Sequence, residues 1–395
     1  MSRVHQLRRS GLPMQAIHAD IEGNLVRLHH DDDALEAMRA AIAAARGEVL
    51  LEMYWFASDH TGHLFAEALE EAVARGCRVR VVYDAVGSLG SDGAMFDRLR
   101  AAGCEVLEYH PIAPWRTRFR WTQIGRRNHR KLLVVDGTLA ILGGVNIADP
   151  WAARAEGGGG WRDDMVSVRG PAAAKVRTIF KRSWGAMAAQ ETGVQDEQLG
   201  EVHLEEEEGA EAGRARVRVL GNHYRDERKG IRQAYLQQIQ GARRQVLIAN
   251  PYFVPDRAIR RALAAAVRRG VDVRVLVPGE SDIPIVRWAS RAFYDELLHA
   301  GVQIYEWQGS VLHTKTAVVD DEWATIGTFN LDARSIRYNL EINAMIIDAG
   351  LAHGMRRRFL HDLESAIQVT VPVWRQRPLL ERLLEWFLAR FAGWL

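Results

Sequence analysis

The stretch HRKLLVVDG, residues 129–137, places a histidine, an arginine, a lysine and an aspartate around four aliphatic residues. This composition is too polar for an ordinary buried strand. Almost the same stretch returns as HTKTAVVDD at residues 313–321, with histidine, lysine and aspartate at the same relative positions. Of the five lysines in the chain, Lys131 and Lys315 fall in these two stretches. A repeat that keeps polar residues in register favours a duplicated functional unit over a duplicated scaffold without shared chemistry.

The similarity extends well beyond the two histidine stretches. Each copy predicts a strand, a helix, a strand, a second helix and a strand, followed by the histidine strand and a Gly-Asn loop. The predicted helices end at glycines, as helices commonly do. The chain is therefore two copies of one α/β unit. The matching segments are 48–59 with 245–256, 68–84 with 262–278, and 101–111 with 299–309.

Composition sets the boundaries of this organisation. A chain of 395 residues with 48% hydrophobic and 26% charged residues is long enough for two folded domains. The segment 196–217 is acidic and poor in large apolar residues, which is typical of a linker. We predict a first domain at 1–195, this acidic linker at 196–217, a second domain at 218–372, and a C-terminal amphipathic helix at 373–395.

Other features of the composition exclude some classes of protein. The net charge of +2 is too small to indicate a class of partner, so any anion-binding surface must be local. Cys77 and Cys104 give neither a disulfide framework nor metal-ligand spacing, and we expect both to be buried in a reducing compartment. The first residues lack the apolar run of a signal peptide, and no uninterrupted apolar run of 18 residues occurs, so we expect no membrane span.

The histidine stretches predict a phosphate pocket. Residues i and i+2 of a strand point to the same side, so His129 would project with Lys131 and His313 with Lys315. A pseudo-twofold packing of the copies would bring both pairs together. Two ammonium groups can neutralise the oxygens of a phosphodiester while one imidazole attacks phosphorus and the other protonates the leaving alkoxide. The lysines supply the positive charge, so we expect no metal and no other cofactor.

Four further residues are expected around the histidines. Asn146 and Asn330 each follow their histidine by 17 residues, which fits amide donors that bind the phosphate oxygens. A catalytic histidine usually needs a carboxylate to orient it. The candidates are Asp163 and Glu341, each at the start of the apolar strand after the Gly-Asn loop.

The two motif aspartates carry a different expectation. Asp136 and Asp320 lie seven residues after their histidines, an odd offset that points them away from the pocket in a straight strand. We expect structural roles for them, in contacts with backbone or arginine near the strand end.

At this point the sequence resembles a known family. The doubled His-x-Lys-x4-Asp pattern with its Gly-Asn loops is similar to the phospholipase D superfamily, and GGVNIAD (143–149) and TFNLDARSIRYNLEIN (328–343) resemble bacterial cardiolipin synthases, in particular a shorter B type without N-terminal membrane-spanning helices. The resemblance implies an α/β fold of two pseudo-twofold-related domains, each a mixed β-sheet flanked by helices, with the active site between them. The catalytic motif that it implies is His129, Lys131, Asp136, His313, Lys315 and Asp320.

The resemblance also implies a reaction. A phosphatidyl group would pass from one phosphatidylglycerol to a hydroxyl of another through a phosphohistidine, with release of glycerol; phosphatidylethanolamine remains open as a donor. We assign His129 as the nucleophile and His313 as the general acid, although pseudo-symmetry permits the reverse. The alternatives are a phosphodiesterase or nuclease that uses water, and a membrane-binding module with an inactive pocket.

The C-terminus favours lipid over nucleic acid as the partner. On a helix, residues 379–395 place a broad apolar arc opposite Glu381, Arg382 and Glu385. Such a helix either covers the core or lies in a membrane interface. We predict a peripheral protein on the cytoplasmic side of a bacterial inner membrane, bound to its anionic surface. The basic, aromatic segment 114–130 is a second candidate for contact with anionic headgroups, and it would also suit single-stranded nucleic acid.

Overall fold

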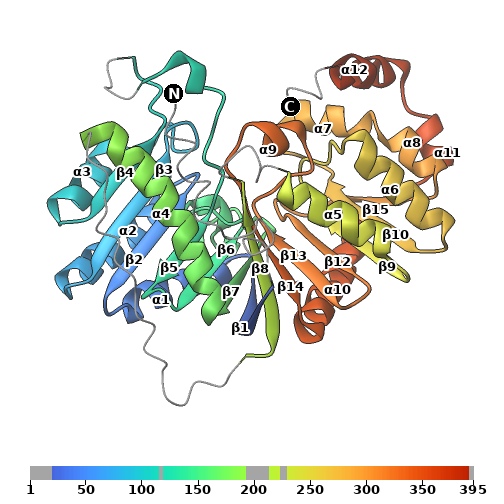
Figure 1. Cartoon of the computed structure of the whole chain (residues 1–395). Helices are drawn as coiled ribbons and strands as arrows, with labels where there is room; N and C mark the ends of the chain where they lie inside the picture. The colour runs from blue at the N-terminus through green and yellow to red at the C-terminus, as the bar shows by residue number, and fades with distance from the viewer. Residues whose placement is uncertain (1–19, 115–118, 193–212, 223–228, 391–395) are drawn as a thin grey trace, which may run out of the picture.

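The computed structural model describes residues 20–114, 119–192, 213–222 and 229–390. Their strands join in one fifteen-stranded sheet flanked by helices (Figure 1). Each helix in these ranges is too short or too polar to cross a membrane. The order of the strands across the sheet is β15-β11-β10-β9-β12-β13-β14-β8-β1-β7-β6-β5-β2-β3-β4.

The first copy follows the predicted alternation of strands and helices. Its strands are β1 (Ile21–His30), β2 (Glu48–Met53), β3 (Arg78–Asp84), β4 (Glu105–Tyr109), β5 (Leu132–Val135), β6 (Leu139–Gly143) and β7 (Asp164–Arg169). Its helices are α1 (Asp33–Ala44), α2 (His60–Ala74), α3 (Gly93–Ala101), α4 (Pro171–Thr192) and the 3-10 turns η4 (Trp121–Gln123), η5 (Asp149–Trp151) and η6 (Arg154–Glu156). Strands β2, β3 and β4 are parallel, whereas β5, β6 and β7 are antiparallel, so the sheet is mixed as predicted.

The second copy repeats this plan. Its strands are β8 (Ala215–Gly221), β9 (Gln245–Ala249), β10 (Asp272–Pro278), β11 (Gln303–Trp307), β12 (Thr316–Val319), β13 (Trp323–Gly327), β14 (Ile342–Ile347) and β15 (Ala366–Val369). Its helices are α5 (Gly230–Gly241), α6 (Arg257–Arg268), α7 (Pro284–Arg291), α8 (Tyr294–His299), α9 (Ala333–Arg337), α10 (Ala349–Glu364), α11 (Val371–Arg375) and α12 (Leu379–Ala389). The predicted helix-ending glycines adopt positive φ angles: Gly76, Gly103, Gly270 and Gly301.

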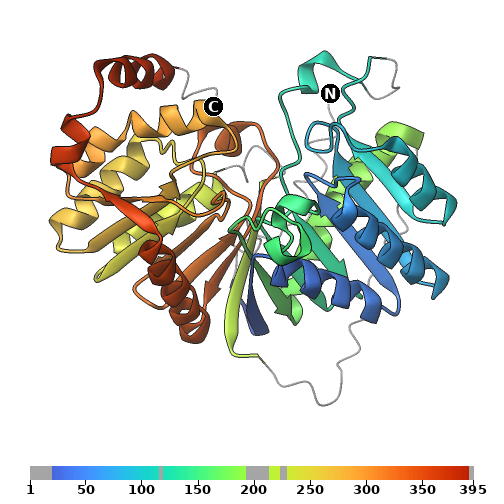
Figure 2. The ribbon, with the colours of Figure 1, turned by 180° about the vertical axis from the view of Figure 1, so that it is seen from behind.

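The two copies meet at the middle of the sheet. Strand β1 pairs antiparallel with β8, and the strand order outward from this seam is equivalent in both copies. Figure 2 shows β1 and β8 side by side below the centre of the molecule. This arrangement is the expected pseudo-twofold one, except that the two sheets form one continuous sheet.

Three apolar cores hold the layers together. One belongs to the first copy, where Phe65 and Leu69 of α2 pack with Val49 of β2, and another lies in the equivalent place in the second copy. The third is shared between the copies and contains buried residues from both halves of the sheet, such as Val134 and Ile326. The copies are therefore joined by a common hydrophobic core as well as by strand pairing.

The structure corrects two of the predicted boundaries. The acidic linker was expected to end at residue 217, but β8 begins at Ala215; residues 196–212 of that linker lie outside the described residues. The predicted C-terminal helix at 373–395 is two helices, α11 and α12, separated at residues 376–378. The sequence analysis also missed β1.

Asp136 and Asp320 occupy equivalent turns at the ends of β5 and β12. Asp136 accepts hydrogen bonds from the backbone N–H groups of Arg46, Gly47 and Glu48 at 2.8 to 3.0 Å. Asp320 accepts the equivalent three from residues 243–245. Both aspartates have positive φ angles, of 51° and 55°. These contacts are the structural, backbone-directed ones expected from the odd offset, and neither aspartate lines the pocket that contains the two histidines, so the catalytic role implied by the family resemblance stays a prediction.

Asp136→Ala is therefore expected to destabilise the fold. The substitution leaves three backbone donors without their acceptor, and because they are partly exposed we expect a loss of about 2 kcal/mol in the free energy of unfolding. Asp320→Ala should behave in the same way, whereas Asp97→Ala on the exposed face of α3 should not. Urea denaturation followed by circular dichroism measures the loss. An unchanged urea midpoint together with abolished activity would instead place Asp136 in catalysis.

Candidate active site

The two histidines are each held by a carboxylate from the other copy. His129 Nδ1 lies 3.0 Å from Oε2 of Glu341, and His313 Nδ1 lies 2.6 Å from Oδ2 of Asp163. Both carboxylates are fully buried and both histidines are nearly so. The sequence identified Asp163 and Glu341 as partners of the histidines, and the structure shows that the pairs are crossed. The bond at Nδ1 leaves Nε2 of each ring for chemistry.

Backbone hydrogen bonds reinforce the crossing. The N–H of His129 donates to the carbonyl of Leu340 at 2.9 Å, next to Glu341 in the chain. The N–H of His313 donates to the carbonyl of Arg162 at 2.8 Å, next to Asp163. Each histidine segment thus runs beside the segment that carries its carboxylate.

The two lysines lie directly behind the histidines. Lys131 and Lys315 precede β5 and β12 by one residue, so the segment is extended but the regular strand starts after it. Lys131 Nζ donates to the carbonyl of His129 at 2.8 Å, and Lys315 Nζ lies 2.8 Å from Nδ1 of His313. Both side chains are buried. The structure therefore places each lysine with its histidine, as the i, i+2 spacing predicted.

The pKa values of both lysines are lowered, mainly by burial. Burial, followed by the nearby Lys315 ammonium, holds the pKa of Lys131 well below its usual value. Burial lowers the pKa of Lys315 to about 8, although Asp163 partly offsets the effect. Two buried ammonium groups that repel each other favour an anion between them. The site is thus electrostatically prepared for a phosphate.

Burial also lowers the pKa of both histidines, to about 4 for His129. At neutral pH the imidazole of His129 is therefore mainly neutral, the state that a nucleophile requires. Burial opposes ionisation of the two carboxylates, but Lys315 and His313 outweigh it at Asp163, and His129 does so at Glu341, so both pKa values stay below the usual range. The carboxylates are thus charged and able to stabilise an imidazolium.

The carboxylates differ in their other hydrogen bonds. Glu341 accepts from the hydroxyls of Thr328 at 2.5 Å and Ser335 at 2.8 Å. Asp163 accepts from the indole Nε1 of Trp151 at 3.1 Å. Each carboxylate is therefore fixed by side chains in or just after the Gly-Asn loop of its own copy.

A pocket of about 490 Å³ opens over these residues. His129, His313, Asn146 and Asn330 all line it, so the structure brings the predicted histidines and asparagines together. The carbonyl oxygen of Asn146 accepts from the backbone N–H of Trp55 at 3.1 Å, which turns its amide nitrogen to other partners. The other lining residues are Tyr54, Trp55, Val86, Gly87, Leu89, Arg127, Trp151, Trp161, Tyr252, Asp282, Ile283, Val286, Asp332, Arg334 and Asn339.

Aromatic rings enclose the histidines. Tyr54 meets the ring of His129 edge to face, with centroids 5.0 Å apart, and Lys131 Nζ lies 4.9 Å from the Tyr54 centroid. Trp151 meets His313 in the same way at 5.2 Å. These contacts restrict rotation of the imidazoles. The repeat does not mark these aromatics as site residues, although Tyr54 lies in the segment 48–59, whose pattern predicts a strand.

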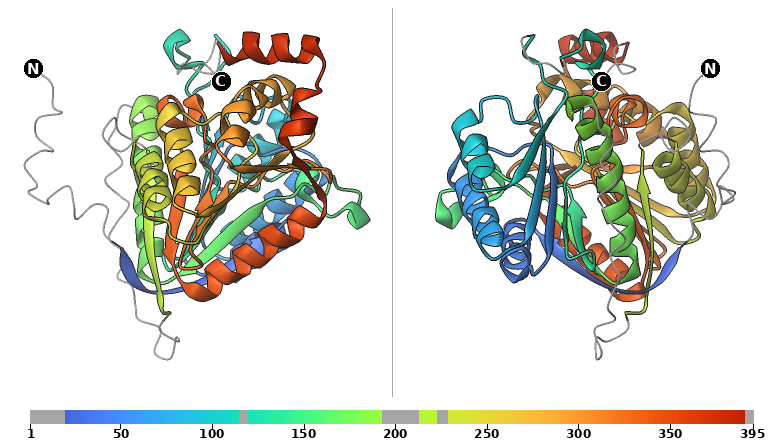
Figure 3. Two further views of the ribbon diagram at one scale, coloured as in Figure 1. Left: turned by 90° about the vertical axis from the view of Figure 1, so that its right-hand side faces the viewer. Right: turned by 60° about the vertical axis from the view of Figure 1, so that its left-hand side comes forward.

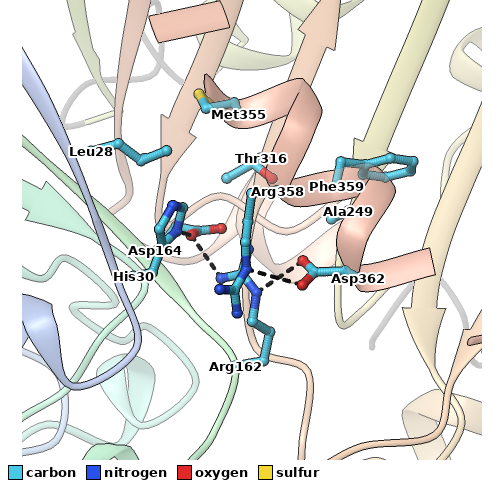
Figure 4. A pocket seen from close by; sticks show the side chains of 10 residues that line it. All are labelled: Leu28, His30, Arg162, Asp164, Ala249, Thr316, Met355, Arg358, Phe359 and Asp362. Carbon is cyan, nitrogen blue, oxygen red and sulfur yellow. Dashed lines mark hydrogen bonds and ion pairs between the residues drawn. The ribbon is translucent and has the colours of Figure 1, made fainter. Parts of the chain in front are cut away.

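A buried ionic cluster supports the His313 side (Figure 4). Arg162 binds Asp164 through Nη1 at 2.7 Å and Asp362 through Nε at 2.9 Å. Asp164 also accepts from the hydroxyl of Thr314 at 2.6 Å. Because Asp362 belongs to α10 and Asp164 to β7, the cluster ties the second copy to the first beside the crossed pair. Arg162 was not singled out from the sequence.

Within the described ranges, no group of three or more histidine, cysteine or carboxylate side chains has a geometry that could hold a metal ion. The expectation that the chemistry needs no metal or other cofactor stays a prediction.

The sequence matches the family model described as "Cardiolipin synthase, PLD-like domain" over residues 38–184 and 235–363, one segment in each copy. The chain belongs to the phospholipase D-like cardiolipin synthase family. The resemblance found in the histidine motifs is confirmed by this match.

Relatives cover most of the chain. A cardiolipin synthase of Geobacillus kaustophilus (strain HTA426) is 36% identical over 358 residues, which is 91% of this chain and 70% of the relative. The major cardiolipin synthase of Bacillus subtilis (strain 168) is 32% identical over 355 residues, 89% of this chain and 71% of the relative. The crystal structure of a phosphatidylserine synthase from Haemophilus influenzae Rd KW20 has the same fold, with a TM-score of 0.67 and 14% sequence identity. The match covers 93% of this chain and 92% of the synthase chain.

Removal of either orienting carboxylate is expected to lower kcat far more than it changes KM. Glu341→Gln keeps the shape of the side chain but removes the charge that fixes His129, and losses of about 10³ to 10⁴ follow from loss of an orienting carboxylate in related geometries. Asp163→Asn should act equally on His313. Glu48→Gln is the matched control. It removes a carboxylate that pairs with Arg177 at the start of β2, whereas the site residue Tyr54 follows the end of that strand. A Glu341→Gln variant with near-normal kcat would contradict an orienting role.

Proposed function

We propose that this protein is a phosphatidyltransferase that makes cardiolipin from two molecules of phosphatidylglycerol and releases glycerol. The observation that carries the proposal is the crossed arrangement, in which two carboxylate-bound histidines from different copies line one pocket backed by two buried lysines. Such a site offers one imidazole as a nucleophile, a second imidazole that can carry a proton beside its carboxylate, and fixed positive charge, which suits a double displacement at a phosphodiester. Membership of the cardiolipin synthase family supports the same choice of substrate.

The reaction runs in two steps that use the histidines in turn. In the first, Nε2 of His129 attacks phosphorus while the bond from phosphorus to the glycerol oxygen breaks, and His313, which enters this step as the imidazolium paired with Asp163, gives its Nε2 proton to the departing oxygen. In the second, His313 removes the proton from a hydroxyl of the second phosphatidylglycerol, which attacks the phosphohistidine and frees His129. Glu341 and Asp163 stabilise the imidazolium that forms in each step because they bind Nδ1 of each ring.

The positive charge for the transition state comes from Lys131 and Lys315. A phosphorane-like transition state carries more charge on its non-bridging oxygens than the ground state does, and buried ammonium groups stabilise it without reorganisation. Asn146 and Asn330 add amide groups to the same pocket. In this proposal no metal ion takes part.

The deciding experiment supplies labelled phosphatidylglycerol in vesicles and separates the lipid products. We expect cardiolipin and free glycerol, with His129→Ala and His313→Ala each reducing the rate by about 10³ or more, as for histidines that act as a unit in covalent catalysis. EDTA should leave the rate unchanged. Formation of phosphatidic acid instead of cardiolipin would identify a hydrolase, and full activity in either histidine variant would exclude the phosphohistidine mechanism.

We also propose that α12 attaches the protein to the anionic cytoplasmic surface of a bacterial inner membrane. This helix lies at the top edge of the molecule, next to α7 (Figure 3). Its polar side faces the protein: Glu385 is only 2% exposed and binds Arg291 at 3.3 Å and Arg377 at 3.0 Å. Its apolar side faces outward, with five large side chains more than half exposed, namely Leu379, Leu380, Leu383, Trp386 and Phe387.

This orientation favours the membrane interface over the core-covering alternative. A helix that covered the core would bury its leucines and expose its charges, whereas α12 buries Glu385 and Leu388 but exposes most of its large apolar side chains. Phe391, Trp394 and Leu395, which extend the same arc in the sequence, lie outside the described residues, as do residues 115–118 of the second candidate surface. Trp121 and Ile124 of that second surface are exposed.

Leu380→Ser combined with Leu383→Ser is expected to weaken binding to anionic vesicles by about tenfold or more. Each leucine that is partly buried in acyl chains contributes about 1 kcal/mol, so two give at least a tenfold change. Ile367→Ser on β15 removes an equally exposed aliphatic residue and should have no effect. Co-sedimentation with vesicles measures the binding. Unchanged binding by the double variant would place the membrane contact elsewhere.

A further inference from the structure

The two copies contribute the same histidine and asparagine to the pocket, but they differ in the acidic residues that line it. At repeat-equivalent positions, the first copy carries Ser88 and Ala148 where the second carries Asp282 and Asp332. Both of these aspartates line the pocket that contains the two histidines. Two carboxylates repel an anionic phosphodiester, and although their charge partly offsets the lowering of the Lys315 pKa by burial, their place in the pocket wall also lets them bind another part of the substrate.

Asp282 is held beside the second histidine. The hydroxyl of Tyr252 donates to Oδ2 of Asp282 at 2.6 Å, and the Tyr252 ring lies 6.5 Å from the ring of His313, edge to face. Asp282 is itself exposed to the pocket opening. The carboxylate therefore stands near the histidine to which the proposed function gives the proton transfers with the alcohol.

Asp332 supplies a second carboxylate from a different loop. It is 3% exposed, and its Oδ1 accepts from the backbone N–H of Ser335 at 2.7 Å at the start of α9. Burial raises its pKa to about 7, which shows how little solvent reaches the group. A buried acid that lines a pocket and has this one close backbone partner is available to a ligand there.

An unpaired acceptor and a nearby donor complete this side of the pocket. Asn330 is 2% exposed and lines the pocket, and its Oδ1 has no hydrogen-bond partner in the described part of the chain. A buried polar atom without a partner is costly unless a ligand or water binds it. Arg334 lines the same pocket and offers guanidinium donors. The second copy thus presents both acceptors and donors.

We propose that Asp282, Asp332 and Asn330, with Tyr252 and Arg334, form a subsite for a polyhydric alcohol, which binds the glycerol headgroup of the acceptor phospholipid. The inference rests on the proposed function and adds to it the site of acceptor recognition. A hydroxyl group both donates and accepts hydrogen bonds, so a glycerol headgroup can use the carboxylates and the guanidinium together, whereas an ammonium headgroup only donates. The buried lysines nearby would also repel an ammonium group.

The subsite places the reacting hydroxyl for the second step. One glycerol hydroxyl loses its proton to His313 while its oxygen forms the new bond to phosphorus. The bond between phosphorus and Nε2 of His129 breaks, and its electron pair returns to the imidazole. The remaining hydroxyl binds a carboxylate of the subsite, so a monohydric alcohol would lack this anchor.

A competition between alcohols tests the subsite. The donor is a diacylglycerol phosphate esterified to p-nitrophenol, which leaves without needing a proton, so that the pre-steady-state burst of p-nitrophenol reports the first step alone. Glycerol, 1-propanol and phosphatidylglycerol compete as acceptors, and the lipid products are separated. We expect the wild type to favour glycerol over 1-propanol by about tenfold or more per mole, the scale of a site built to bind a hydroxyl.

Asp282→Asn and Asp332→Asn should each reduce that preference several-fold and should slow cardiolipin formation in parallel, by a larger factor than any change in the burst of p-nitrophenol. Asparagine can still cap α9, so Asp332→Asn keeps the fold, and Asp282 is exposed and threatens no packing. Asp295→Asn on the exposed surface of α8 is the matched control and should preserve the preference.

The outcomes separate the two proposals. A wild type that transfers to both alcohols without preference, or variants that keep the preference, would overturn the subsite but leave the transferase intact. A loss of glycerol preference without any slowing of cardiolipin formation would overturn the assignment to the lipid headgroup. A wild type that gives only phosphatidic acid would overturn the transferase and the subsite together.

Discussion

The crossed pairing of histidine and carboxylate is the constraint on which the rest of the molecule depends. Glu341 and Asp163 are fully buried, and a buried carboxylate is tolerated only with a close, well-oriented partner. Because each histidine lies in the other copy, neither copy supplies the imidazole that pairs with its own carboxylate. The seam between β1 and β8, the shared apolar core and the Arg162 cluster all hold the copies in the one arrangement that brings both pairs into register.

The repeat in the sequence was sufficient to predict most of the fold. Strands and helices with regular apolar periodicity were placed correctly, since the same pattern occurs twice and its helices end at glycines. The two strands at the seam were missed for physical reasons. Strand β1 has only two buried residues, Asn24 and His29. Both are polar, so the strand shows no alternation of buried apolar residues. Strand β8 alternates clearly but follows an acidic stretch that dominates the composition around it.

The site shows a similar division. The spacing within each copy identified the histidines, lysines and asparagines that meet in or behind the pocket, and the odd offset of Asp136 correctly separated it from them. The spacing could not reveal that the carboxylates cross over, since pairs within a copy and pairs between copies satisfy the same sequence pattern. Arg162, Asp282 and Asp332 were missed because each breaks the repeat, and a search for shared residues passes over the positions where the copies differ.

The contact between α12 and α7 connects the proposed membrane surface to the pocket. Glu385 of α12 is buried between Arg291 and Arg377, and turning the helix over would leave this buried charge network without its partners. Its apolar side is therefore held outward. Arg291 is the last residue of α7, and α7 also carries Val286, which lines the pocket. The helix that would enter the lipid surface is thus fixed to the helix that forms a wall of the active site, so a change in one has a short and rigid route to the other.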